Sequence, residues 1–204
     1  DMKKIVSMAR TVKPDLHIIV DAVQHAPHGV IDVEQLGIDG INFAPYKFFG
    51  TRGIGFAWVS VRVAILSHDK LLAKDPAQWE LGSPAPSIFA ATSEIVNYVC
   101  WIGSNFIDSK DRRTLYVEGM NRIKLHERAL HYRLLHGGGT VPGLNDMVGV
   151  QTFFDQEDLT TRDLIVPIAI EGLDCTHAVR EYEKQGVIVY ERIATSLYSG
   201  RMLD

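Results

Sequence analysis

The 204-residue sequence predicts an α/β fold, because short β-branched apolar runs alternate with longer segments of helical periodicity. The first such run, over residues 17–22, has the continuous apolar pattern of a strand covered on both faces. Two more runs follow at 40–44 and 55–63, and a cluster of glycines separates them. Residues 112–136 place apolar side chains near one stripe and predict a long helix.

The other elements follow from spacing and from residues that end helices. Residues 2–11 predict a helix, because Ile5, Met8 and Ala9 have helical spacing and Pro14 closes the segment. Three consecutive glycines, 137–139, stop the long helix. We place a domain boundary near residue 100, which gives domains 1–100 and 101–204. The remaining expectations are helices at 90–107 and 176–185 and strands at 148–154, 164–170 and 187–190.

Composition excludes several classes of protein. The 21 Lys and Arg against 25 Asp and Glu give a formal charge of −4, which argues against nucleic acid as the main partner. The longest apolar run, 164–170, is far shorter than the roughly 18 residues that a membrane span needs. Cys100 and Cys175 cannot form a disulfide framework or a four-cysteine zinc site, so we expect a reducing, cytoplasmic setting. The histidines of the long helix are five residues apart and predict no shared metal.

An acid and a lysine stand at the ends of successive predicted strands. Asp21 lies at the end of the first run, and Lys47 follows the second run 26 residues later. Ligands of open α/β sheets bind outside the carboxyl ends of the strands, so both side chains could meet at one crevice. A lysine there can form a Schiff base with an aldehyde cofactor, and a carboxylate can hold a pyridine nitrogen protonated. From these residues alone, a solvated lysine and a capping aspartate remain the alternatives.

The surrounding residues resemble the pyridoxal-phosphate signature of class V aminotransferases, a family that includes cysteine desulfurases and selenocysteine lyases. Two further segments, 79–84 and 186–189, also resemble that family. The resemblance implies the fold-type I architecture, with the end of a three-layer α/β/α large domain in 1–100 and a small α+β domain in 101–204. The signature positions in register are Asp21, Gln24, His28, Asp32, Asp39, Lys47, Gly50, Gly53 and Gly55.

The resemblance also implies roles for individual residues. Lys47 would carry pyridoxal 5'-phosphate as a Schiff base, Asp21 would pair with its ring nitrogen, and Gln24 would donate to its phenolic oxygen. Ser83 would reach the cofactor phosphate of a second subunit, which implies a homodimer. His28 is interpreted as a packed structural histidine.

Two residues before the lysine depart from the family pattern. Ala44 replaces a serine and Tyr46 replaces a histidine, which removes two of the usual phosphate contacts. The Tyr46 hydroxyl can donate to a phosphate oxygen and so compensate. The alternative for Tyr46 is a packed aromatic residue.

The functional expectation is an enzyme that acts on an α-amino acid. Desulfurases need a nucleophilic cysteine in a loop that corresponds to residues 190–199, and no cysteine occurs there. The expected activity is therefore like that of a cysteine desulfurase or C–S lyase without the persulfide cysteine, and we expect Cys100 and Cys175 to be buried and inert. An aminotransferase or an amino-acid epimerase is an alternative, and a non-catalytic binding fragment is another. Because enzymes of this family are longer, we expect the chain to be a central excerpt.

Overall fold

The structure, a computed structural model, describes residues 1–75, 78–82 and 85–193. The chain divides into two compact units, Asp1–Glu127 and Arg128–Asp204. This division describes how the chain packs into compact units. It does not test the domain boundary expected near residue 100, which stays a prediction. None of the helices in the described ranges is long and apolar enough to cross a membrane.

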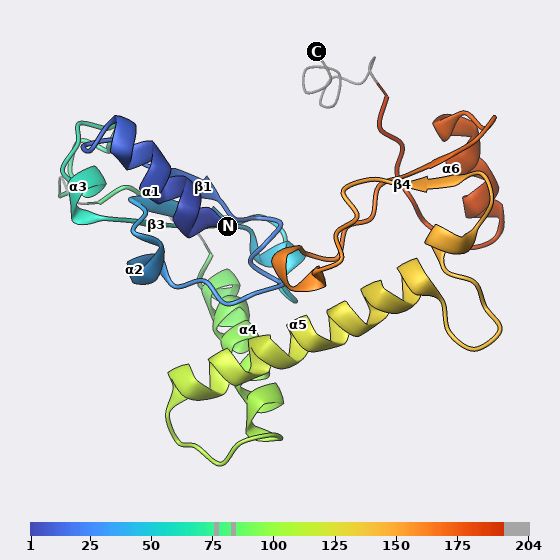
Figure 1. The fold of residues 1–204 in the computed structure, drawn as a ribbon. Helices are drawn as coiled ribbons and strands as arrows, with labels where there is room; N and C mark the ends of the chain where they lie inside the picture. Colours follow the sequence, from blue (N-terminus) through green and yellow to red (C-terminus); the bar gives the residue numbers. More distant parts are fainter. Residues whose placement is uncertain (76–77, 83–84, 194–204) are drawn as a thin grey trace. The chain divides into compact units, whose positions relative to one another are not determined.

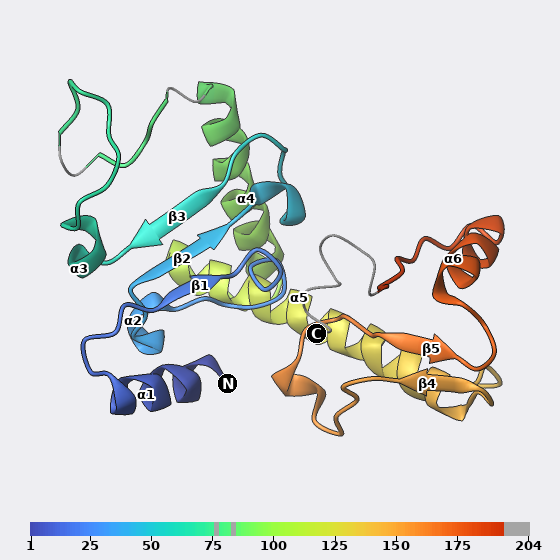
Figure 2. The same ribbon diagram turned by 90° about the horizontal axis from the view of Figure 1, so that it is seen from above.

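A three-stranded sheet forms the centre of the first unit (Figure 2). Its strands are β1 (Ile19–Asp21), β2 (Gly40–Phe43) and β3 (Phe56–Val59), in the order β1-β2-β3. β1 and β2 are parallel, whereas β3 runs antiparallel to β2. The carboxyl end of the sheet is defined here as the end at which β1 and β2 finish and β3 begins. The opposite end of the strands is called the amino end.

The strand expected over 55–63 is correct only in its first part. β3 ends at Val59, and a short helix, α3 (Val61–Ala64), follows it. The reason is Ser60, which caps α3 and whose N–H and hydroxyl both donate to Asp39, at 2.8 and 3.2 Å. The backbone bond continues the β2–β3 pairing by one residue, and the hydroxyl bond holds the Ser60 side chain where α3 begins, so the rest of the apolar run is helical.

Asp39 joins four segments of the chain at the amino end. Its side chain, in a residue only 2% exposed, accepts hydrogen bonds from Arg10 Nη2 at 2.7 Å, Ile18 N at 3.1 Å and Ser60 Oγ. Arg62 Nη1 lies 3.6 Å away. Burial by itself would raise the pKa of Asp39, but the Ile18 N–H, the charges of Arg62 and Arg10 and the Ser60 hydroxyl outweigh it and lower the pKa.

Two apolar clusters stabilise the first unit. In the first, Val6 of α1 (Met2–Val12) packs against Ala22, Ile38 and Ile41, beside the short helix α2 (Val33–Leu36). The second connects the chain after β2 to two long helices, α4 (Pro86–Ser104) and α5 (Arg112–His136), which are visible in Figure 1. Its buried members are Phe48, Ile95, Val99 and Met120.

Close backbone contact fixes the packing of α4 against α5. A Cβ atom on Gly119 would lie 2.1 Å from the Val99 carbonyl oxygen, so only glycine fits at this crossing. Val99 and Met120 are completely buried there, and each such side chain stabilises the fold by about 1.5–3 kcal/mol. The predicted bounds of α5, residues 112–136, are confirmed.

The second unit contains the end of α5, a two-stranded antiparallel sheet and α6 (Cys175–Lys184). Its strands, β4 (Val150–Thr152) and β5 (Ile168–Ile170), are shorter than expected. Pro167 has no N–H to donate, so regular pairing of β5 starts one residue after it. The strand expected at 187–190 was wrong, because these residues form no regular structure and Ile188 and Tyr190 are each 80% exposed. The unit also holds single 3-10 turns at Leu144–Asp146 and Leu159–Thr161.

Candidate active site

Lys47 lies at the carboxyl end of the sheet, on a single 3-10 turn, η1 (Pro45–Lys47), that follows β2. Pro45 is buried and begins the turn, where its fixed φ angle suits a helical start. The Lys47 N–H donates to Ala44 O at 3.1 Å, and the Gly50 N–H donates to Pro45 O at 2.9 Å. The backbone of Lys47 is therefore held on both sides.

The residues after Lys47 need unusual backbone geometry. A Cβ atom on Gly50 would lie 2.7 Å from Ile95 Cδ1 and 2.8 Å from Pro45 O, so a larger residue would push the turn away from α4. Phe49 has a φ of 57°, a left-handed conformation that is strained for an aromatic residue. Its ring is T-shaped against Tyr98 of α4, at 5.1 Å between centroids. This contact holds the strained residue in place.

Asp21 ends β1 on the same edge of the sheet. It pairs in register with Asn42 of the parallel strand β2, so the two strands deliver Asp21 and Lys47 to the carboxyl end together. Asp21 is exposed, and its Oδ1 accepts a hydrogen bond from Val23 N at 3.0 Å. Gln24 follows in the same turn and is also exposed. A carboxylate, an amide and an amine are thus grouped at one sheet edge.

Tyr46 adds an aromatic ring and a second cation to this edge. Its residue is 41% exposed, and the Lys47 Nζ lies 5.7 Å from the ring centroid. The guanidinium carbon of Arg52 lies 4.9 Å from the same centroid, within range of a cation–π contact. Arg52 was not among the site residues predicted from the sequence, although its place between Gly50 and Gly53 was a usable signal. Two cations beside a phenol favour an anionic ligand group here.

Three other signature positions have structural roles in the described chain. His28 Nδ1 lies 2.9 Å from both carboxylate oxygens of Glu127 on α5, and both side chains are 21% exposed. This agrees with the interpretation of His28 as a structural residue. Asp32 caps α2 by accepting from the backbone and side-chain amides of Gln35. Asp39 anchors the amino end, as described above.

The remaining residues singled out from the sequence are Ser83 and the two cysteines. Ser83 is outside the described residues, so its expected contact with a phosphate stays a prediction. Cys100 is buried, as expected, whereas the expectation of burial was wrong for Cys175, which is half-buried because it starts α6 at the surface. Within the described ranges, no group of three or more His, Cys, Asp or Glu side chains could hold a metal ion.

Comparisons with known proteins give both family and fold. Residues 1–132 match the family model for "Aminotransferase class-V". A probable cysteine desulfurase 2 of Mycobacterium leprae is 24% identical over 187 residues, which cover 89% of this chain and 42% of that protein. A probable cysteine desulfurase of Mycoplasma genitalium is 39% identical over 59 residues, which cover 29% of this chain and 14% of that protein. The chain therefore spans less than half the length of these relatives.

Two solved structures have the same fold over most of this chain. The apo cysteine desulfurase from Thermococcus onnurineus NA1 superimposes with a TM-score of 0.67 and 17% identity, covering 93% of this chain and 45% of that one. The cysteine desulfurase CsdA from Escherichia coli, an S-sulfonic acid form, has a TM-score of 0.61 and 18% identity, covering 92% and 44%. The expected fold class, the mixed α/β architecture of fold-type I enzymes, is confirmed. Because the family model matches residues 1–132, which are more than half of the 204 residues and include the whole first unit, the chain belongs to the class V aminotransferase family.

Proposed function

We propose that the complete protein is a pyridoxal-phosphate-dependent enzyme that acts on an α-amino acid. The observation that carries this proposal is the parallel pairing of β1 with β2, which brings Asp21 and Lys47 to one sheet edge. The donor set there fits the cofactor group by group. The Lys47 amine can react with the cofactor aldehyde, and the Asp21 carboxylate can pair with the ring nitrogen. The Gln24 amide can donate to the phenolic oxygen, and the Tyr46 hydroxyl can donate to the phosphate.

Each residue then has a defined chemical task. Lys47 binds the cofactor through its amine and, once released by substrate, moves the proton at the substrate α-carbon. Asp21 keeps a proton on the ring nitrogen, because a carboxylate next to a protonated ring stabilises the charged form. Gln24 orients the ring, while Tyr46 and Arg52 stabilise the phosphate. When bound, the cofactor supplies an electron acceptor for the substrate carbanion.

Within this class, we propose a C–S lyase activity that resembles desulfuration but has no persulfide cysteine. The sequence of residues 190–199 contains no cysteine. Cys100 is buried in α4, and the Cys175 Sγ lies 3.9 Å from the carbonyl oxygen of Arg192. Cysteine and water would then give pyruvate, ammonia and free sulfide. We propose in addition that the enzyme is a cytoplasmic homodimer in which Ser83 reaches the partner's cofactor phosphate.

The cofactor assignment can be tested by chemical trapping. Full-length protein loaded with pyridoxal phosphate is reduced with borohydride, digested and examined by mass spectrometry. We expect the cofactor mass on Lys47, and no such mass at that position in Lys47→Ala. Lys74→Ala, which changes a lysine away from the sheet edge, serves as the control and should label normally. Cofactor on another lysine, or on none, contradicts the proposal.

The reaction can be tested by product analysis. Full-length protein is given L-cysteine, and pyruvate, alanine and sulfide are measured while an alkylating probe traps persulfides. We expect pyruvate and sulfide in equal amounts, with the same yield in a Cys100→Ala, Cys175→Ala variant. Alanine together with a trapped persulfide would instead indicate a true desulfurase. A D-amino acid or a keto acid made from other substrates would indicate an epimerase or an aminotransferase.

A further inference from the structure

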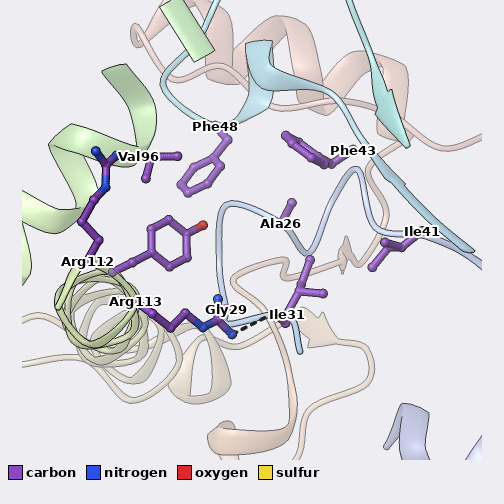
Figure 3. A pocket seen from close by; sticks show the side chains of 10 residues that line it. Ala26, Gly29, Ile31, Ile41, Phe43, Phe48, Val96, Arg112 and Arg113 are labelled. Atoms are coloured by element: carbon purple, nitrogen blue, oxygen red, sulfur yellow. Dashed lines mark hydrogen bonds between the residues drawn. The ribbon is translucent and has the colours of Figure 1, made fainter. Parts of the chain in front are cut away.

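The first unit contains a cavity of about 360 Å³ that the proposed reaction does not use (Figure 3). This volume is within the range of about 300–1,000 Å³ that is typical of small-molecule sites. All of its lining residues belong to the first unit. They are Ala26, Gly29, Ile31, Ile41, Phe43, Phe48, Val96, Arg112, Arg113 and Tyr116.

The cavity lies between the two apolar clusters. Ile41 belongs to the cluster beneath α1, and Phe48 belongs to the cluster formed with α4 and α5. The sheet and the two helices therefore border an open apolar cavity that neither cluster fills. Such surface is favourable for an apolar ligand, because covering it removes it from water.

Two arginines give this apolar cavity a net positive charge. Arg112 and Arg113 start α5, and no acidic residue is among the ten that line the cavity. Arg112 Nη2 donates to Asn97 Oδ1 at 2.9 Å, and Arg113 Nη2 donates to Ile31 O at 3.4 Å. Each guanidinium carries five N–H groups, so these bonds leave donors for a ligand. Asp111, the nearest acid in sequence, accepts from Thr114 N and Oγ1.

Tyr116 provides a further donor at the same wall. Burial raises the pKa of Tyr116, with a smaller opposing effect from the Arg113 charge. The phenol is therefore protonated at neutral pH and can donate a hydrogen bond to an anion. Figure 3 shows the two arginines on one side of the cavity and Phe43 and Ile41 on the other. The side of the cavity that holds Phe43 and Ile41 is therefore apolar, and both cations lie on the opposite side, together with Val96.

We propose that this cavity binds a small amphipathic carboxylate, with its apolar body against Phe43 and Phe48 and its carboxylate toward Arg112 and Arg113. A neutral apolar ligand would leave the two cations without a counter-charge. A small inorganic anion would leave the apolar wall uncovered. A carboxylate with an aliphatic or aromatic tail satisfies both walls.

The test uses full-length protein loaded with pyridoxal phosphate, so that the proposed phosphate site at Tyr46 and Arg52 is filled. Octanoate is the probe, and octan-1-ol and inorganic phosphate are the comparison ligands. Isothermal titration calorimetry should show saturable octanoate binding at one site per chain, at least tenfold tighter than octan-1-ol and with no phosphate binding. Arg112→Gln together with Arg113→Gln should weaken octanoate at least tenfold and leave octan-1-ol unchanged. Arg133→Gln, on α5 but outside the cavity lining, should change neither ligand.

A second variant tests the location of the site. Val96→Phe places more volume in the cavity and should abolish binding of octanoate, while circular dichroism shows a retained fold. Absence of saturable octanoate binding to the unaltered protein would overturn the proposal. Equal binding of octanoate by the unaltered protein and the double arginine variant would also overturn it, because the charge would then have no role.

Discussion

Each end of the three-stranded sheet carries a carboxylate, and the two carboxylates have opposite surroundings. Asp39 at the amino end is 2% exposed and accepts from Arg10, Ile18 and Ser60. Asp21 at the carboxyl end is exposed and accepts from Val23, its neighbour in the turn. A buried carboxylate must be fully paired, since burial without partners is costly. An exposed one keeps its lone pairs for a ligand. The amino end therefore supplies stability, and the carboxyl end is left free for chemistry.

The largest expected effect is on the free energy of unfolding, when each of the two aspartates is replaced by alanine in a separate variant. Asp39→Ala should lower the free energy of unfolding by about 3 kcal/mol, because it leaves two arginines and a backbone N–H without their acceptor. The partial exposure of Arg10 and Arg62 keeps this cost at the lower end of the range for broken buried pairs. Asp21→Ala should change the unfolding free energy by less than about 0.5 kcal/mol. Similar losses of stability in the two variants, measured by denaturant titration, would contradict this difference between the two ends of the sheet.

Turnover should show the opposite order. Asp21→Asn keeps the shape of the side chain but cannot hold a ring nitrogen protonated, so we expect a loss on the order of 100-fold in kcat at unchanged stability. Asp39→Asn should leave kcat unchanged when activity is expressed per molecule of folded protein. Near-normal turnover in Asp21→Asn, measured on protein of known cofactor content, would mean that Asp21 is structural.

Tyr46→Phe tests whether the Tyr46 hydroxyl at the carboxyl end binds the cofactor phosphate. If its hydroxyl donates to a phosphate, the variant should bind cofactor more weakly by about 1.5–3 kcal/mol, the usual value for a hydrogen bond to a charged group. Tyr98→Phe removes a hydroxyl from α4 without this role and should bind cofactor normally. Unchanged affinity in Tyr46→Phe, from a cofactor titration, would favour the packed-aromatic interpretation.

The smallest effect concerns acid stability. The pKa of Asp39 is lowered from its ordinary value of 3.8, so its contribution to stability is complete above that value and is lost as pH falls through the lower folded pKa. Below about pH 4 the stability difference between the unaltered protein and Asp39→Asn should therefore shrink. A difference that stays constant from pH 6 to pH 3, measured by urea unfolding, would show that the ionised form of Asp39 is not the stabilising species.

Sequence reasoning succeeded where the signal is local. The periodicity of 112–136 gave both ends of α5, and the strand ends gave the shared edge of Asp21 and Lys47. It failed where distant residues decide the outcome. The start of α3 at Ser60 involves Asp39, 21 residues earlier. The structural role expected of His28 agrees with the structure, but its partner Glu127, 99 residues later, was not predicted. No spacing rule connects such residues, because tertiary contact alone brings them together.

The strand order has a consequence for handling the chain in solution. Among the described residues β1 pairs only with β2, so its outer edge presents unpaired backbone N–H and C=O groups. Ile19 on that strand is 65% exposed. An open apolar edge is a template for strand addition by another copy. The 204 residues prepared by themselves should thus self-associate as concentration rises in sedimentation experiments, and Ile19→Lys should suppress this. Such oligomers would reflect edge-to-edge pairing and would not test the proposed homodimer.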